Sequence, residues 1–231
     1  MQEIRDEELK YRQRNIERID RTITALVAER VRVTHEIADL LAADAAYQGA
    51  PGAFSEDAAR DLAGPRAQLL PCPTLEDVFD ALASGRARSA VVPIENSLAG
   101  EVPRCADLIA RHEARVDAEC ERLIRHALIG APGATLDSIR IVRSHPMALA
   151  QCARFVESHP AMEPLAAFDT AGAVAEIVAA GRTDTAAIAS RRAAELHGGV
   201  VLAEDIQDRA DNRTRFLLIT PGRSSSAPRT S

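Results

Sequence analysis

The most regular pattern in the chain is an apolar stripe near its beginning. Hydrophobic residues recur there at alternating steps of three and four, the spacing of one face of an α-helix. The pattern predicts one helix over residues 15–42, with Arg30 where an aliphatic side chain would be expected. Because a narrow stripe on a single helix cannot bury itself, we expect it to pack against a second copy of the chain in a homodimer. The stripe consists of Ile16, Ile19, Ile23, Leu26, Val33, Ile37 and Leu40.

After this helix the pattern changes to short apolar runs that alternate with amphipathic segments. Such an alternation of strands and helices is typical of α/β proteins with mostly parallel sheets. We therefore expect a two-lobed α/β domain over residues 45–221, preceded by the helical segment 1–44 and followed by a disordered tail, 222–231. The predicted strands are 90–94, 123–129, 139–142, 185–189 and 216–219, and the predicted helices are 55–62, 75–84, 102–112, 147–157, 170–180 and 190–196.

Polar residues gather where several of the predicted strands begin or end. Glu95-Asn96-Ser97 and Ser144-His145-Pro146 each follow a strand, and Thr214-Arg215 stands immediately before one. Each cluster alone is typical of a helix cap or a turn. Ligands of open α/β sheets bind beyond the carboxyl ends of strands, however. The recurrence of the clusters therefore predicts a binding cleft between two lobes.

Composition narrows the classes of ligand. The 231-residue chain has a formal net charge of −6, which argues against binding to nucleic-acid backbones or anionic membranes. Aromatic residues make up only 3% of the chain, without any Trp, so base stacking is not expected. An anionic substrate would therefore need locally placed cations or N–H donors. The charged N-terminus is unlike an export signal, and no apolar run approaches the roughly 18 residues of a membrane span, so we expect a cytoplasmic protein.

The sequence indicates neither a metal nor a nucleotide cofactor. The cysteines (Cys72, Cys105, Cys120 and Cys152) form no C-x-x-C pair, and the histidines lack ligand spacing. The stretch Gly49-x-x-Gly52-x-Phe54-Ser55 lacks the Lys that ends a phosphate loop. Its glycines and the helix start that follows suit a carboxylate instead, because they let backbone N–H groups approach it.

Taken together, five stretches in order over residues 46–220 resemble the prephenate dehydratase family. Departures occur at Met147, where the family has Gln, and at Ala99 and Glu101, which flank Gly100. The matching stretches are Tyr47-x-Gly49-x-x-Gly52-Ala53-Phe54-Ser55-Glu56, Val92 to Ser97 with Gly100, Ser144-His145-Pro146 with Gln151-Cys152, Thr170 to Ala173, and Asp208 through Asn212-x-Thr214-Arg215-Phe216.

The resemblance implies a cofactor-free enzyme that removes water and carbon dioxide from prephenate to give phenylpyruvate in phenylalanine biosynthesis. The site would lie between two lobes like those of periplasmic binding proteins, with Thr214 at the departing hydroxyl. The planar guanidinium of Arg215 suits a substrate carboxylate. Glu95 would be a better acid if burial raised its pKa, or would only orient its loop. Other contacts with the substrate are expected from Ala53, Phe54, Ser55, Asn96, Ser97, Ser144, Gln151 and Phe216.

Two further expectations concern the ends of the chain. The sequence stops where the family commonly adds a regulatory ACT domain, so feedback through such a domain is not expected. The first helix resembles the first helix of all-helical chorismate mutases, and Arg30 matches an arginine of their site. Gln13, Asp39 and Leu41 depart from that pattern. We therefore expect an oligomerisation helix that has lost mutase activity.

Alternative functions remain open at the level of sequence. A nonaromatising prephenate decarboxylase, built on the same domain, would lose carbon dioxide and keep the ring hydroxyl. Arogenate is a possible substrate in place of prephenate. The two-lobed architecture also resembles solute-binding proteins, so a non-catalytic binder of aromatic precursors is a further alternative.

Overall fold

The chain begins with one long helix, α1 (Gln2–Leu41), which forms a contact unit of its own over Met1–Ala42. The computed structural model describes residues 2–222, without the side chains of residues 2–4, 6, 35, 38 and 39. Of the predicted tail 222–231, residues 223–231 therefore lie outside the described part. The predicted helix is confirmed. It starts earlier than predicted because the first residues are good helix formers with ion pairs such as Arg12–Glu8.

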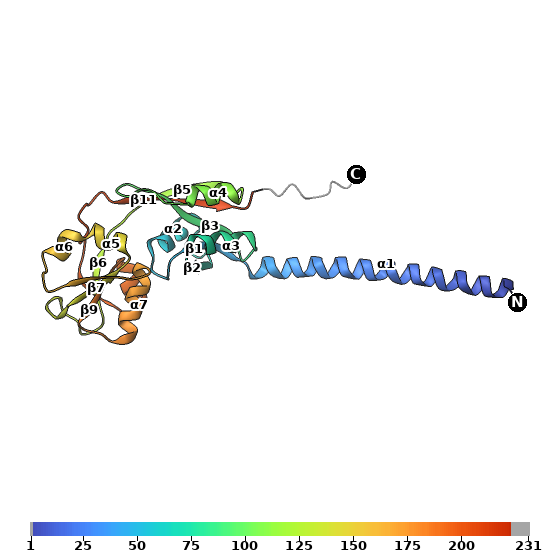
Figure 1. Ribbon diagram of the computed structural model, residues 1–231, viewed down its shortest axis with the longest axis horizontal. Helices are drawn as coiled ribbons and strands as arrows, with labels where there is room; N and C mark the ends of the chain where they lie inside the picture. The colour runs from blue at the N-terminus through green and yellow to red at the C-terminus, as the bar shows by residue number, and fades with distance from the viewer. Residues whose placement is uncertain (1, 223–231) are drawn as a thin grey trace. The chain divides into compact units, whose positions relative to one another are not determined.

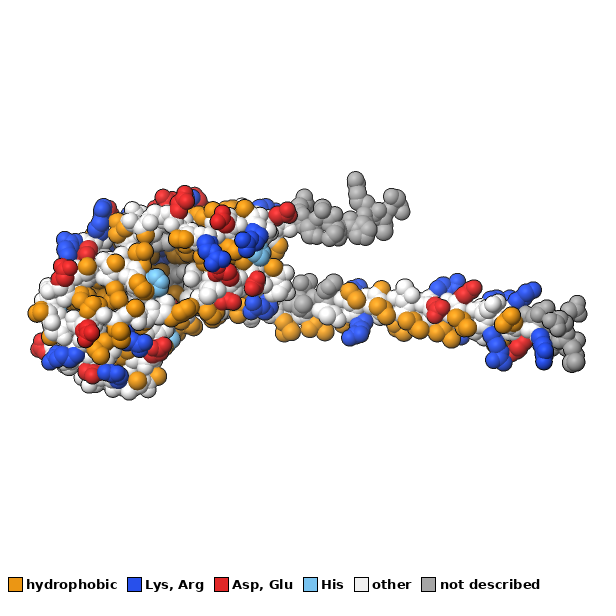
Figure 2. Space-filling model, in the orientation of Figure 1, with side chains coloured by type: hydrophobic (Ala, Val, Ile, Leu, Met, Phe, Trp, Pro, Cys, Tyr) orange, Lys and Arg blue, Asp and Glu red, His pale blue; other side chains and the backbone are white. Residues whose placement is uncertain are grey.

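The apolar stripe of α1 is exposed along the helix, where Figure 2 shows hydrophobic side chains in a row. Leu26, for example, is 63% exposed. Charged residues are interleaved along the remaining faces. Within the described residues, no helix is both long enough and apolar enough to cross a membrane.

From Ala43 onward the chain folds into two lobes, each built on one β-sheet (Figure 1). The elements of the first lobe are β1 (Ala43–Gln48), α2 (Phe54–Ala63), β2 (Leu69–Cys72), α3 (Leu75–Ala83), β3 (Ala87–Asn96), β4 (Gly100–Glu101), α4 (Cys105–Arg111), β5 (Arg115–Leu123) and β11 (Arg213–Thr220). Its sheet has the order β2-β1-β3-β11-β5, and β4 pairs with the end of β3.

The second lobe is formed by the intervening part of the chain. Its elements are β6 (Ala127–Gly130), the 3-10 helix η1 (Leu136–Ser138), β7 (Ile141–Ser144), α5 (Pro146–Gln151), α6 (Ala153–Glu157), β8 (Glu163–Ala166), α7 (Thr170–Ala180), β9 (Thr185–Ala189), α8 (Arg191–His197) and β10 (Val200–Ala203). Its sheet has the order β10-β6-β9-β7-β8. The chain therefore crosses between the lobes twice, at residues 124–126 and again at residues 204–212.

The two-lobed α/β architecture agrees with the prediction, but the sheets are mixed rather than mostly parallel. Four of the nine described strand pairings are parallel and five are antiparallel. Three of the antiparallel pairings join β3 to β4 and β6 to β9 and β10. The other two arise from the second crossing. When the chain returns from the second lobe, β11 enters the first sheet between β3 and β5 and runs antiparallel to both.

Several strands were not predicted from the sequence. β1 reads ADAAYQ, whereas β2 and β8 each contain a proline. Alanine and proline are poor strand formers, so these strands exist because of their partners in the sheet rather than through local preference. The strand predicted over 123–129 also proves to be three pieces: the end of β5, the first crossing and the start of β6.

Each lobe has its own apolar core. In the first lobe, α3 packs Val78 and Phe79 against strand residues such as Val92, and all three are completely buried. In the second lobe, Leu128 and Ile188 on neighbouring strands form the equivalent layer. Burial of these side chains supplies most of the stability that holds the strand ends, and hence the polar residues on them, in place.

The lobes are joined directly where the loop before α2 meets α8. Ser190 Oγ donates to the carbonyl of Gly52 at 2.6 Å, and His197 Nε2 lies 2.8 Å from the carbonyl of Pro51. Gly52 has φ +94°, and a Cβ there would lie 2.7 Å from Cα of Ala193. Only glycine therefore allows the two backbones to approach this closely.

This contact gives a prediction with a matched control. Gly52→Ala and Gly64→Ala both place a side chain at positive φ, but no atom lies within 4 Å of a Cβ at Gly64. We expect the positive φ to cost both variants about 1–3 kcal/mol of unfolding free energy, and Gly52→Ala to lose about 1–3 kcal/mol more through the clash with α8. Urea unfolding measures both losses, and equal losses would contradict the contact.

Candidate active site

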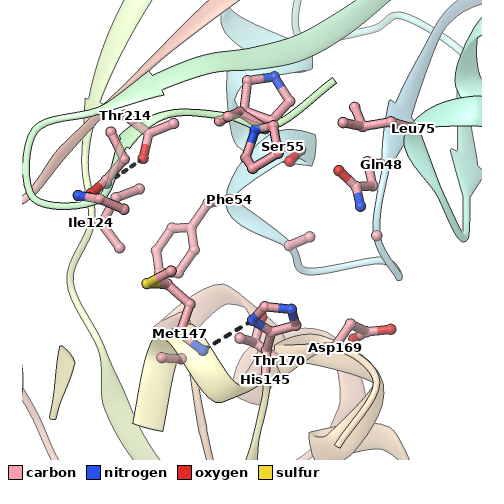
Figure 3. A pocket seen from close by; sticks show the side chains of 18 of the residues that line it. Gln48, Phe54, Ser55, Leu75, Ile124, His145, Met147, Asp169, Thr170 and Thr214 are labelled. Atoms are coloured by element: carbon pink, nitrogen blue, oxygen red, sulfur yellow. Dashed lines mark hydrogen bonds between the residues drawn. The ribbon is translucent and has the colours of Figure 1, made fainter. Parts of the chain in front are cut away.

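A cavity of about 700 Å³ opens between the two lobes. In Figure 3, Ser55 and Thr214 from the first lobe lie on one side of it, and His145 and Thr170 from the second lobe lie on the other. The side chain of Phe54 projects between them. The cavity is therefore built by both lobes, as the recurrence of polar clusters at strand ends predicted.

The N-terminus of α2 is the best donor group for an anion in this cavity. Its cap residue, Ala53, makes no side-chain hydrogen bond, and the N–H groups of Phe54 and Ser55 have no partner among the described residues. The hydroxyl of Ser55 is likewise unpaired within that set, and all three residues line the cavity. Free N–H groups and the helix dipole together favour a bound carboxylate.

Three other helices also begin at the cavity, but their first turns are already capped by side chains. Thr74 accepts from the N–H of Asp77 at α3, His145 from the N–H of Met147 at α5, and Asp169 from the N–H of Gly172 at α7. A fourth helix, α4, also lacks a side-chain cap, but only its cap residue Arg104 and the residues before it line the cavity. In α2 the uncapped first-turn residues themselves line the cavity.

A buried acid fixes the loop that leads into α2. Glu56 is 3% exposed, and its Oε2 accepts a hydrogen bond from the N–H of Gly52 at 2.6 Å. Oε1 pairs with Arg60 at 2.7 Å and with Arg192 of the second lobe at 3.2 Å. Burial alone raises the pKa of the Glu56 carboxyl, but these hydrogen bonds and cations outweigh burial, and the pKa is lowered. Glu56 thus stays ionised and ties the loop to both lobes.

Thr214 and Asn96 form the central polar pair of the cavity. They lie opposite each other on β11 and β3, and Asn96 Nδ2 donates to Thr214 Oγ1 at 2.9 Å. Asn96 Oδ1 accepts from the N–H groups of Leu98 and Ala99, both at 3.0 Å, which fixes the orientation of the amide. Because Thr214 accepts from Asn96, its own hydroxyl hydrogen remains available to a ligand.

Arg215 and Glu95 do not line the cavity, contrary to what their predicted roles require. Successive side chains of a strand point to opposite faces, so the neighbours of Thr214 and Asn96 face away. Arg215 instead pairs with Glu95 at 3.0 Å and with Glu119 at 3.4 Å, and its side chain is 40% exposed. A direct role of either residue at the substrate does not fit this placement.

Ser97 and Ser144 are also placed elsewhere. Ser97 Oγ accepts from the N–H of Arg213 at 3.0 Å and donates to the carbonyl of Asp211, which joins two loops. Ser144 is completely buried, and its Oγ donates to the carbonyl of Ile188 at 2.6 Å. Both hydroxyls are structural, because neighbouring backbone takes their hydrogen-bonding capacity.

Most other predicted site residues are brought together in the cavity. Phe216 is 2% exposed and forms part of the apolar wall of the cavity. The predicted residues that line the cavity are Ala53, Phe54, Ser55, Asn96, Gln151, Thr214 and Phe216.

Several lining residues were missed from the sequence. Phe168 and Asp169 follow β8, a strand that was not predicted, although an acidic cap before a helix marks the position. Thr170 belongs to a stretch that matched the family but was given no role at the site. His126 lies in the first crossing, where its Nε2 is 2.9 Å from Gln151 Oε1. Burial lowers the pKa of His126, and the hydrogen bond to Gln151 offsets this only in part. Histidine spacing could not reveal it, because its partner is remote in sequence.

The charged groups of the lining are mostly acidic, since Glu76, Glu101 and Asp169 stand against Arg104. Arg104 is the only Lys or Arg among the described lining residues, and it is already paired with Glu76 at 2.6 Å. Over the same part of the chain, no group of three or more His, Cys, Asp or Glu side chains is arranged to hold a metal ion. The donors for an anionic ligand are therefore neutral hydroxyl, amide and backbone N–H groups.

Comparison with known proteins gives a consistent result. A family model described as prephenate dehydratase matches residues 45–224. The chloroplastic arogenate dehydratase 5 of Arabidopsis thaliana is 43% identical over 186 residues, which cover 80% of this chain and 43% of the plant protein. A bifunctional N-acyl-homoserine lactone acylase/prephenate dehydratase of Komagataeibacter europaeus is 39% identical over 173 residues, covering 75% and 61% of the two chains.

A solved structure extends the likeness to the fold. The crystal structure of prephenate dehydratase from Arthrobacter aurescens in complex with L-Phe matches with a TM-score of 0.71 and 31% identity. The match covers 81% of this chain and 63% of that one. The chain spans less than half the length of the plant relative named above.

Proposed function

The chain belongs to the prephenate dehydratase family of lyases, and from this premise we propose that it converts prephenate to phenylpyruvate. The observation that carries the proposal is the Thr214 hydroxyl. It is held by Asn96 with its hydrogen free, in the same cavity as the uncapped start of α2. The Thr214 hydroxyl can assist a leaving hydroxyl, while the N–H groups at the start of α2 bind a carboxylate.

The proposed reaction breaks two bonds, one at each of two opposite carbons of the substrate ring. The bond between the ring and its carboxylate breaks, and its electrons move through the ring to expel the hydroxyl at the opposite carbon. The products are carbon dioxide, phenylpyruvate and hydroxide, which takes a proton from solvent to become water. Because the ring becomes aromatic, the main barrier is the poor leaving group, and a hydrogen bond donated by Thr214 stabilises its developing charge.

Neutral groups would hold the dianion in place. The N–H groups of Phe54 and Ser55, with the Ser55 hydroxyl, suit one carboxylate, and the amide of Gln151 is a further donor from the second lobe. Phe216 gives the ring an apolar wall. This arrangement favours the transition state by position rather than by a strong acid.

Arogenate is a second candidate substrate, favoured by one residue. Arogenate carries an ammonium group where prephenate carries a ketone. The carboxylate of Asp169 lines the cavity while its Oδ1 caps α7 by accepting from the N–H of Gly172 at 2.5 Å. Such a carboxylate would attract an ammonium group and repel a further anion.

The substrate is decided by comparing the two compounds directly. We expect the purified chain to release phenylpyruvate from prephenate with a kcat/KM at least about tenfold above that for arogenate, a difference of about 1.4 kcal/mol. NMR identifies the product. Preference for arogenate that disappears in Asp169→Asn, which keeps the helix cap, would favour the second candidate. A product that retains the ring hydroxyl would overturn the dehydratase proposal in favour of the nonaromatising decarboxylase.

The role of Thr214 is tested by removing its hydroxyl without changing its shape. We expect Thr214→Val to lower kcat about 100- to 1,000-fold, the effect of losing one donor to a developing negative charge. Thr214→Ser should recover most of the rate. The melting temperature should change little, since Asn96 Nδ2 keeps acceptors on Asn212 and Arg213. A valine variant with normal kcat would exclude the proposed role.

We also propose that α1 pairs with α1 of a second copy of the chain. The helix has 40 residues, and its exposed stripe from Ile16 to Leu40 runs for about 36 Å. Because the apolar residues recur at the spacing of a coiled coil, the stripes of two copies can pack against each other along their length. Arg30 is the one position at which a charged side chain interrupts this stripe. The likeness of α1 to the chorismate mutase helix stays a prediction.

Self-association through α1 is tested by two variants, one that places a carboxylate on the apolar stripe and one that places it on the opposite face. Ile23 belongs to the stripe, and Ala28 lies on the opposite face. We expect sedimentation velocity to give a dimer for the wild type and for Ala28→Glu, and a monomer for Ile23→Glu. A monomeric wild type, or a dimer that survives Ile23→Glu, would contradict the pairing.

A further inference from the structure

His126 stands where both lobes and the cavity meet. Its backbone N–H donates to Gln207 Oε1 at 2.8 Å, and its carbonyl accepts from the N–H of Ile206 at 3.0 Å. Both partners belong to the second crossing, so His126 ties the first segment that connects the lobes to the second. The side chain is 3% exposed and lines the cavity.

The imidazole ring contacts one cavity residue from each lobe. Its centroid is 5.4 Å from that of Phe54 in an edge-to-face arrangement, and its Nε2 lies 2.9 Å from Gln151 Oε1. Its Nδ1 is buried and has no partner among the described residues. The ring thus has one polar contact, and that contact is the Gln151 amide.

The unpaired Nδ1 identifies which nitrogen carries the proton. A neutral imidazole has one N–H donor and one bare acceptor nitrogen. If the proton were on Nδ1, a donor would be buried without an acceptor, which is rarer and more costly than an unpaired acceptor. The proton therefore belongs on Nε2, where it is donated to Gln151 Oε1.

The same bond fixes the direction of the Gln151 amide. With Oε1 turned to His126, the NH2 group points away from the imidazole, and it has no partner among the described residues. The backbone carbonyl of Gln151 is also held, since it accepts from the N–H of Asp208 at 2.7 Å. The free NH2 group is thereby left to the cavity that both side chains line.

We propose that His126 is a positioning residue, whose Nε2–H holds the Gln151 amide so that its NH2 group donates to an anionic oxygen of the substrate. This inference rests on the proposed function for the identity of the substrate. The reverse amide orientation would present a carbonyl oxygen to a dianion and repel it. No proton is transferred, and the role of His126 is exerted entirely through Gln151.

Kinetics provide the first test. His126→Leu removes the donor, whereas the amide of His126→Gln can reach the position of Nε2. We expect His126→Leu to raise KM for prephenate about 10- to 100-fold with a smaller change in kcat, as for the loss of one hydrogen bond to a charged group. His126→Gln should recover most of this loss. Gln151→Ala should cost a similar factor, and the double variant His126→Leu/Gln151→Ala should cost little more than either single change.

A second measurement is independent of turnover. In the wild-type chain labelled with ¹⁵N-histidine, the ring signals absent from His126→Gln belong to His126, and we expect them to report a proton on Nε2 and a bare Nδ1. A proton on Nδ1 would overturn the proposal, as would additive losses in KM or an effect of His126→Leu on the melting temperature alone. A wild type that leaves prephenate unchanged would contradict the proposed function, while the tautomer would still decide the positioning role.

Discussion

The cavity depends on one loop that is held from both sides. Residues between β1 and α2 belong to the first lobe, yet Ser190 and Arg192 of the second lobe bind the carbonyl of Gly52 and the carboxylate of Glu56. Glu56 in turn accepts from the N–H of Gly52. This closed set of bonds leaves Phe54 and Ser55 at an uncapped helix start that faces the second lobe. Without it, the donors of α2 would have no defined position relative to Gln151.

A second constraint comes from the return of the chain into the first sheet. Because β11 enters between β3 and β5, Thr214 lies opposite Asn96, whose amide is itself held by the turn at Leu98 and Ala99. The arrangement explains how a chain with net charge −6 could accept a dianion. Binding would rely on oriented neutral donors and a helix dipole, which act locally and are not cancelled by the overall charge.

The sequence predicted the architecture and part of the site, and the errors have a common physical origin. Motif order was enough to bring Ser55, Asn96 and Thr214 into one cavity. It could not assign the face of a strand, so Arg215 and Glu95, each one residue away, were expected at the substrate but lie outside the cavity lining. Ser144 failed for the same reason, since it points into the core. The position of His126 and the antiparallel entry of β11 into the first sheet depend on contacts between residues remote in sequence, which local patterns do not contain.

The central claim is spatial, and a crystal structure of the Thr214→Val variant with bound prephenate tests it most directly. The account predicts the substrate between the lobes, with one carboxylate on the N–H groups of Phe54 and Ser55 and the ring hydroxyl directed at position 214. Prephenate bound outside this cavity, or with a carboxylate on the guanidinium of Arg215, would contradict the account.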